Sequence, residues 1–248
     1  MTKDQWFALG THFRGSIQHW LYPPTCVLCG DHAPGRRDLC PGCQQELTVS
    51  DPCCPICALP TAAGTTHLPC GRCLKKRPLF DRCLTPFRYL PPADELIGGL
   101  KFQGRLSHAR VLGDLLVDYL QQRLTPGTYP QALIPVPLHP RRLRERGFNQ
   151  ALELARPLAR RLQIPLQPQR CRRQLPTSQQ TGLSALERRR NLHGAFRVRD
   201  LRNIRHVALI DDVVTTGATV TELTRMLRRA GVERVEVWAV CRTPAAGR

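Results

Sequence analysis

The sequence predicts an α/β protein in which a parallel sheet with helices follows a small cysteine-rich module. Two observations support this fold class. Ten of the 12 cysteines lie between Cys26 and Cys83, whereas the runs of Val, Ile and Leu that could build a sheet come later. After Phe80 the apolar pattern alternates between the spacing of strands and that of helices, which is typical of a mainly parallel sheet. A chain of 248 residues is long enough for one ordinary domain and a small appendage.

Three consecutive parts are expected: an N-terminal helix within residues 1–22, the cysteine module over 23–80 and the α/β domain over 81–248. In the α/β domain, strands are predicted at 84–90, 132–136, 195–198, 207–210 and 235–240, and helices at 93–102, 106–124, 149–162 and 218–230. Ligands of such a domain are expected beyond the carboxyl ends of the strands.

The sequence also bears on the compartment. No apolar stretch approaches the roughly 18 to 20 residues that cross a bilayer, and the N-terminus lacks the features of a secretory signal. We therefore expect a cytoplasmic protein without a transmembrane segment. In a reducing compartment, CxxC pairs hold metal more often than they form disulfides.

The cysteine module contains four CxxC pairs, separated by 10, 10 and 12 residues: Cys26/Cys29, Cys40/Cys43, Cys54/Cys57 and Cys70/Cys73. Each pair presents two thiolates from one turn, and two pairs complete a tetrahedral shell, so the module matches two structural zinc ions. An iron–sulfur cluster and redox dithiols are the alternatives, although redox chemistry would not require four copies. Sequential pairing is the simplest assignment, but interleaved pairing stays open, and Cys53 could replace Cys54.

The charge of the chain requires anionic partners. The formal net charge is +18, and residues 141–205 alone contain 17 arginines and four acidic residues. Such arginine-rich segments attract nucleic acid, nucleotides and pyrophosphate alike. A basic surface with no dedicated ligand is the alternative.

The end of the strand at 207–210 carries the strongest functional signal. Two adjacent carboxylates, Asp211 and Asp212, follow the strand, where their repulsion must be offset by hydrogen bonds, a metal or ligand hydroxyls. A polar loop then leads into a helix and consists of Thr215, Thr216, Gly217, Ala218 and Thr219. Gly217 permits a turn with converging amides, and the helix N-terminus favours a phosphate. A simple threonine cap of the helix is the alternative.

Two further segments are expected to face the same site. Residues 135–150 follow a strand and carry Arg141, Arg142, Arg144 and Arg146, which suit pyrophosphate or nucleic-acid phosphates. Solvated arginines at a helix entry are the alternative. The polar segment 170–196, which includes Gln180 and Arg188, is interpreted as a mobile loop over the site or as a disordered surface loop.

Residues 207–219 resemble the phosphoribosyl-pyrophosphate signature of type I phosphoribosyltransferases. Together with the CxxC pairs, the Leu-Lys-Phe-Gln-Gly segment at 100–104 and the segments 135–150 and 180–191, in this order, the chain resembles the ComF (GntX-like) family. The resemblance implies a double zinc ribbon followed by a type I phosphoribosyltransferase-like domain. It also implies an association with bacterial DNA uptake or use of external DNA.

The resemblance also implies roles at the site. Asp211 and Asp212 would contact the ribose hydroxyls, residues 215–219 would hold the 5-phosphate, and magnesium would bridge the sugar and pyrophosphate oxygens. The leading interpretation is a ComF-like protein that binds phosphoribosyl pyrophosphate, or a related ribose phosphate, and single-stranded DNA, with DNA-uptake proteins as candidate partners. An active phosphoribosyltransferase is the main alternative, for which the sequence names no general base. A scaffold that has lost its ligand is a third.

Overall fold

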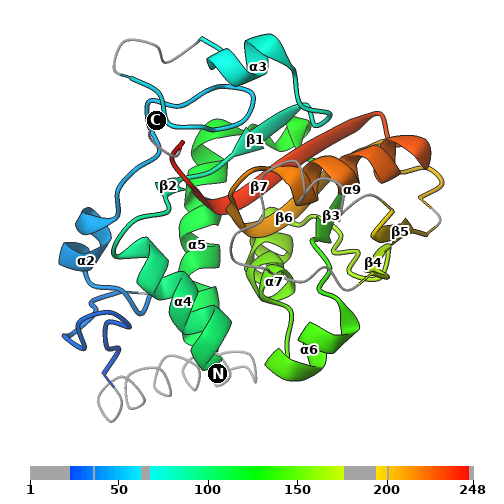
Figure 1. The fold of residues 1–248 in the computed structure, drawn as a ribbon. Helices are drawn as coiled ribbons and strands as arrows, with labels where there is room; N and C mark the ends of the chain where they lie inside the picture. The colour runs from blue at the N-terminus through cyan, green and yellow to red at the C-terminus, as the bar shows by residue number, and fades with distance from the viewer. Residues whose placement is uncertain (1–22, 36, 63–67, 176–193, 200, 246–248) are drawn as a thin grey trace, which may run out of the picture. The chain divides into compact units, whose positions relative to one another are not determined.

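The computed structural model describes residues 23–35, 37–62, 68–175, 194–199 and 201–245 (Figure 1). The helix expected within 1–22 and the candidate residues Gln180 and Arg188 lie outside these ranges. The chain divides into two compact units between Glu46 and Leu47. The first unit contains the short helix α2 (Pro41–Glu46), and the second contains all of the sheet.

A five-stranded sheet forms the centre of the second unit. Its strands are β1 (Arg82–Leu84), β2 (Phe87–Arg88), β3 (Ala132–Pro135), β6 (His206–Val214) and β7 (Arg234–Arg242). The order is β1-β7-β6-β3, β2 also pairs with β7, and all of these pairings are parallel. The middle strands β6 and β7 are buried along most of their length, as expected for a sheet covered on both faces. The predicted fold class is confirmed.

Helices cover both faces of the sheet. The helices of the second unit are α3 (Gly71–Lys75), α4 (Ala93–Gln103), α5 (Leu106–Arg123), α6 (Pro140–Arg146), α7 (Gln150–Leu162) and α9 (Ala218–Arg229), with a 3-10 turn η1 (Pro126–Thr128). Of these, α5, α7 and α9 pack against the strands of the sheet. In Figure 1, α5 and α7 lie behind the sheet and α9 lies in front of it. The helices α5 and α7 approach closely at Gly113, where an added Cβ would lie 2.4 Å from Cγ of Pro157. Gly113 therefore allows this packing.

Two strand predictions were wrong in their extent. The strand expected at 84–90 is divided into β1 and β2, and Pro86, which lacks an amide hydrogen, lies between them. The strand expected to end at Ile210 continues to Val214, because β7 still pairs with it beyond the point where β3 stops. The acid pair, Asp211 and Asp212, thus lies within β6 and not after it.

A small antiparallel hairpin lies apart from the main sheet. It consists of β4 (Cys171–Arg173) and β5 (Phe196–Val198). The predicted strand at 195–198 corresponds to β5, whereas β4 was not predicted. Cys171 and Phe196 are buried and belong to the core that includes α9, so the hairpin is anchored on that face.

Candidate phosphate-binding site and metal sites

The acid pair lies where β6 extends beyond its neighbour β3, since Pro135 at the end of β3 aligns with Ile210. Asp212 is buried, at 3% exposure, and forms an ion pair with Lys101 in the last turn of α4. Asp211 is half-buried, and its Oδ1 accepts a hydrogen bond of 3.0 Å from the amide of Asp212. The accessible carboxylate of the pair is therefore Asp211.

The charge state of the acid pair responds to this environment. Burial and the neighbouring carboxylate of Asp212 raise the pKa of Asp211 well above its usual range, and Lys101 opposes the effect. A cation or a set of hydroxyl donors at Asp211 would relieve the repulsion between the two acids.

The 215–219 loop leads from β6 into α9. Gly217 has φ +78°, a left-handed conformation that glycine adopts without strain, and it caps α9. The hydroxyl of Thr216 accepts a hydrogen bond of 3.3 Å from the amide of Ala218. Within the described part of the chain, the amides of Gly217 and Thr219 donate to no acceptor. Because Thr215 is exposed and the next four residues are half-buried, the loop presents unpaired amides at a helix N-terminus.

A buried arginine supports this loop from β7. Arg242 is 3% exposed, and its Nη1 donates to the carbonyls of Val214, at 2.7 Å, and Thr215. Its Nε donates to the carbonyl of Cys57, at 3.0 Å. Arg242 therefore connects the start of the 215–219 loop with the second cysteine cluster. The sequence analysis missed this residue; its only signal was a charge at the end of an apolar strand.

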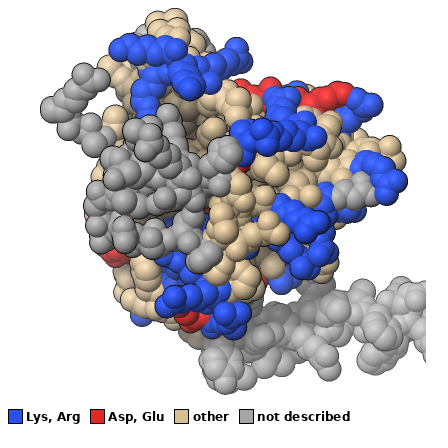
Figure 2. Space-filling view, turned by 45° about the vertical axis from the view of Figure 1, so that its right-hand side comes forward, with Lys and Arg blue, Asp and Glu red and all other residues tan. Residues whose placement is uncertain are grey.

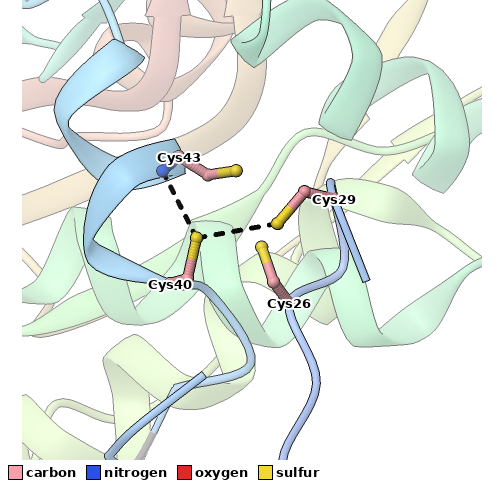
Figure 3. A group of neighbouring side chains, drawn as sticks. All are labelled: Cys26, Cys29, Cys40 and Cys43. Carbon is pink, nitrogen blue, oxygen red and sulfur yellow. Dashed lines mark hydrogen bonds between the residues drawn. The ribbon is translucent and has the colours of Figure 1, made fainter. Parts of the chain in front are cut away.

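The first cysteine cluster consists of Cys26, Cys29, Cys40 and Cys43 (Figure 3). All four Sγ atoms lie within 4.8 Å of one another, and those of Cys29 and Cys40 are 3.7 Å apart. A tetrahedral zinc ion with Zn–S bonds of about 2.3 Å requires S–S distances of about 3.8 Å, so the cluster fits zinc. Burial acts to raise the pKa of Cys26, but amide hydrogen bonds from Cys40 and Cys29 outweigh it and lower the pKa to about 6.

The second cluster consists of Cys54, Cys57, Cys70 and Cys73 and fits zinc equally well. The Sγ atoms of Cys57 and Cys70 are 3.6 Å apart, and the amide of Cys70 donates to Sγ of Cys54 at 3.3 Å. The CxxC motifs are therefore paired sequentially, and Cys54 is the ligand candidate that the geometry supports, not Cys53. This cluster is attached to the sheet, because the amide of Cys83 in β1 donates to the carbonyl of Ile56 at 2.8 Å.

Comparison with known proteins agrees with both parts of this description. Residues 17–74 match the double zinc ribbon domain family, and residues 149–248 match the phosphoribosyl transferase domain family. The chain is 42% identical over 224 residues to the DNA utilization protein YhgH of Escherichia coli O157:H7, which covers 89% of this chain and 98% of YhgH. It is 39% identical over 225 residues to competence protein F of Haemophilus influenzae, which covers 88% of this chain and 96% of that protein. The chain belongs to the ComF (GntX-like) family.

Among solved structures, a purine phosphoribosyltransferase from Pyrococcus horikoshii is similar over 53% of this ComF-family chain and 82% of its own, with 18% identity and a TM-score of 0.33. This similarity is too low to support an argument about function. In the described part of the chain, no helix is long and apolar enough to cross a membrane.

The predicted arginines of the ComF-family protein lie on α6. Arg141 is exposed and pairs with Glu145 at 2.9 Å, and Arg144 is exposed. Arg146 donates to Oε1 of Gln150 at 2.7 Å and lies 6.0 Å from the ring centroid of Phe102. Figure 2 shows basic side chains in several patches on one face, with few acidic side chains between them.

Two arginines interact electrostatically with the acid pair: Arg146 on α6 and Arg173 in β4. Burial lowers the pKa of Arg146, and the charge of Asp212 partly offsets the effect. Burial and the half-buried Arg142 also lower the pKa of Arg173 in β4, whereas Asp211 raises it. Arg173 was not a predicted site residue, because the short strand β4 has no periodicity that marks it.

Proposed function

We propose that this ComF-family protein takes part in DNA uptake or utilisation and binds phosphoribosyl pyrophosphate, or a related ribose phosphate, together with single-stranded DNA. The unpaired amides at the N-terminus of α9, directly after the acid pair, carry the ribose phosphate part of this proposal. The net charge of +18 supports the DNA part. The names of its relatives, DNA utilization protein and competence protein F, agree with this role, and DNA-uptake proteins are candidate partners.

Each group at the site has a proposed role. The amides and hydroxyls of Thr215, Thr216, Gly217, Ala218 and Thr219 hold the 5-phosphate. The carboxylates of Asp211 and Asp212 accept hydrogen bonds from the ribose hydroxyls, and the contact of Asp212 requires Lys101 to share or leave that carboxylate. Arg142 and Arg146 are candidates for the pyrophosphate. Magnesium accompanies pyrophosphate, and the Asp211 carboxylate is a hard oxygen ligand that suits it.

The two cysteine clusters have a structural role in this proposal. Eight thiolates hold two zinc ions in closed shells, which leave no coordination position for a substrate. Zinc therefore stabilises the ribbons and does not act on the ribose phosphate.

Isothermal titration calorimetry with phosphoribosyl pyrophosphate and magnesium tests the ribose phosphate site. We expect saturable binding, and Asp211→Asn should weaken the affinity at least about tenfold, which corresponds to the free energy of one charge-assisted hydrogen bond. Asp114→Asn, which changes a carboxylate on α5 that pairs with Arg161, is the matched control and should bind normally. A correctly folded, zinc-loaded protein that binds no phosphoribosyl pyrophosphate would reject this part and favour a scaffold without ligand.

Phosphoribosyl transfer is a second candidate function. The observation that favours it is the proximity of Arg146 and Arg173 to the acid pair, because cations there would neutralise a departing pyrophosphate. Pyrophosphate release with a panel of nucleobases, abolished by Asp212→Asn, would establish turnover. If phosphoribosyl pyrophosphate binds but no nucleobase causes pyrophosphate release, transfer is rejected and the site only binds its ligand.

A further inference from the structure

Four arginines lie on one face of the β4–β5 hairpin. The antiparallel register places Arg172 directly opposite Arg197. Side chains two residues apart share a face, so Arg170 and Arg199 belong to the same row, and the amide of Arg199 donates to the carbonyl of Arg170 at 2.7 Å. We name this row, Arg170, Arg172, Arg197 and Arg199, the arginine ladder. The opposite face carries Cys171 and Val198, which face the core.

The arginine ladder is electrostatically unfavourable by itself. Like charges directly opposite each other on paired strands destabilise the pair. Among the described residues, no carboxylate lies within ion-pair distance of the exposed Arg172, Arg197 or Arg199. A row of phosphates would remove this repulsion.

The ladder borders a cleft of about 900 Å³. Arg172, Arg197 and Arg199 line the cleft. The segments around α6 and α7 contribute the apolar residues Leu138, Phe148 and Leu152 and the polar Asn149. Glu153 is the one carboxylate among the lining residues, and Arg156 pairs with it at 3.0 Å. The cleft thus combines a cationic wall, whose three arginines have no carboxylate partner among the described residues, with an apolar wall formed by Leu138, Phe148 and Leu152.

Arg173 relates the cleft to the proposed ribose phosphate site. Pro137, which lines the cleft, comes two residues after Pro135, and Pro135 is aligned with Ile210, the residue before the acid pair. Arg173 also lines the cleft, and its Nε is buried and donates to no described residue. The same Arg173 is close enough to Asp211 to feel its charge. A ligand in the cleft would therefore contact an arginine whose charge interacts with that of Asp211.

We propose that the cleft binds a short segment of single-stranded DNA, with its phosphates along the arginine ladder and its bases against the apolar wall. Ladder positions on one strand repeat every two residues, or roughly 6.7 Å, a spacing that an extended nucleotide chain can follow. A duplex would keep its bases stacked inside, away from Phe148 and Leu152. This inference rests on the DNA part of the proposed function and gives it a location.

Fluorescence anisotropy with a labelled oligothymidine, measured from low to high salt, tests the inference on the full-length, zinc-loaded protein. The double variant Arg172→Gln/Arg197→Gln should bind the oligonucleotide at least about tenfold more weakly. The salt slope, which is the magnitude of the slope of log affinity against log salt concentration, should fall by about 1.4, since each phosphate contact to a single strand contributes about 0.7. The matched control Arg160→Gln/Arg229→Gln removes two exposed arginines from α7 and α9. It should retain most of the affinity and the slope.

A second variant separates base contacts from charge. Phe148→Ala should weaken oligothymidine binding about fivefold or more and leave the salt slope unchanged, because a stacking contact involves no counterion release. Polyglutamate should compete poorly. If polyglutamate displaces the oligonucleotide as well as unlabelled DNA does, the apolar wall recognises no base and the proposal is overturned.

The remaining outcomes distinguish this inference from the proposed function. If the wild-type protein binds no single-stranded DNA, the DNA part of the proposed function fails. If the wild-type protein binds DNA but the ladder and control variants lose affinity equally, only the cleft is rejected. Thermal unfolding checks the fold, and the ladder variant should unfold at the wild-type temperature or above it, since two opposed like charges are removed.

Discussion

Arg242 offers the sharpest test of how the second cysteine cluster and the 215–219 loop depend on each other. Its buried guanidinium donates to Val214 and Thr215 at the start of the loop and to Cys57 in the cluster. A hydrogen bond from a charged donor contributes about 1.5–3 kcal/mol, so the two loop contacts contribute about 3–6 kcal/mol at most. In Arg242→Lys the charge is kept, but a single ammonium group cannot reach all of these carbonyls.

We expect Arg242→Lys to lower the free energy of unfolding by about 2–3 kcal/mol, because a lysine keeps roughly half of these contacts. If about half of this loss appears as disorder in the loop, phosphoribosyl pyrophosphate must reorder the loop on binding, and its affinity falls about tenfold. Chemical unfolding and calorimetric titration measure the two effects separately. Arg160→Lys, which changes an exposed arginine in the last turn of α7, is the matched control and should change neither quantity by more than a small amount.

Two results would contradict this reasoning. Unchanged unfolding would mean that the carbonyls find other donors. Reduced stability with normal affinity would mean that Arg242 supports the fold and does not position the loop. The contact between Arg242 and Cys57 also predicts that loss of the second zinc ion weakens ribose phosphate binding, as substitution of Arg242 does. Without zinc, the carbonyl of Cys57 is no longer positioned to accept the hydrogen bond from Arg242.

Three further predictions follow from single sites. Burial acts to raise the pKa of Glu236, but hydrogen bonds, of which that of His206 is the largest, outweigh burial and lower the pKa to about 2. The ionised carboxylate should therefore contribute about 3 kcal/mol to the free energy of unfolding above pH 4.5, and this contribution should be lost as the pH falls toward 2. Glu236→Gln should flatten this pH dependence in acid unfolding curves. Lys101→Met leaves the buried Asp212 unpaired and should destabilise the fold by about 3 kcal/mol in urea unfolding, whereas the double variant with Asp212→Asn should recover most of the loss. Elemental analysis should find two zinc ions per chain and one in Cys54→Ser, and a wild-type value of one would contradict the two-cluster assignment.

The sequence was most informative where the physical constraint is local. The four CxxC pairs predicted two metal clusters because each pair defines its own turn, and the structure pairs them in the simplest way. The apolar runs predicted β6 and β7 because a buried parallel strand is mostly apolar, and the apolar spacing predicted the helix α9 between them. Gly217, directly before α9, has a left-handed conformation, and a turn at this glycine was predicted.

The sequence was least informative where the constraint comes from distant residues. Two adjacent acids indicated a strand end, but pairing with β7 keeps the chain extended to Val214. The partner of Asp212 is Lys101 on α4, and the 100–104 segment supported the family resemblance without giving Lys101 a role. The facing of Arg172 and Arg197 depends on a hairpin whose strands are separated by more than 20 residues. Tertiary pairing of this kind leaves no local signal.

The two proposed ligands should oppose each other's binding. A bound pyrophosphate would add negative charge beside Arg146 and Arg173, which lie near the acid pair, and Arg173 also lines the cleft. The cationic wall would then attract DNA less, and by linkage DNA would weaken ribose phosphate binding by the same factor. We expect a reduction of about three- to tenfold at low salt, which screening should diminish at high salt. Anisotropy titrations of the oligonucleotide with and without saturating phosphoribosyl pyrophosphate measure this factor. Additive binding at low salt would show that the two ligands share no arginine and would contradict the electrostatic link through Arg173.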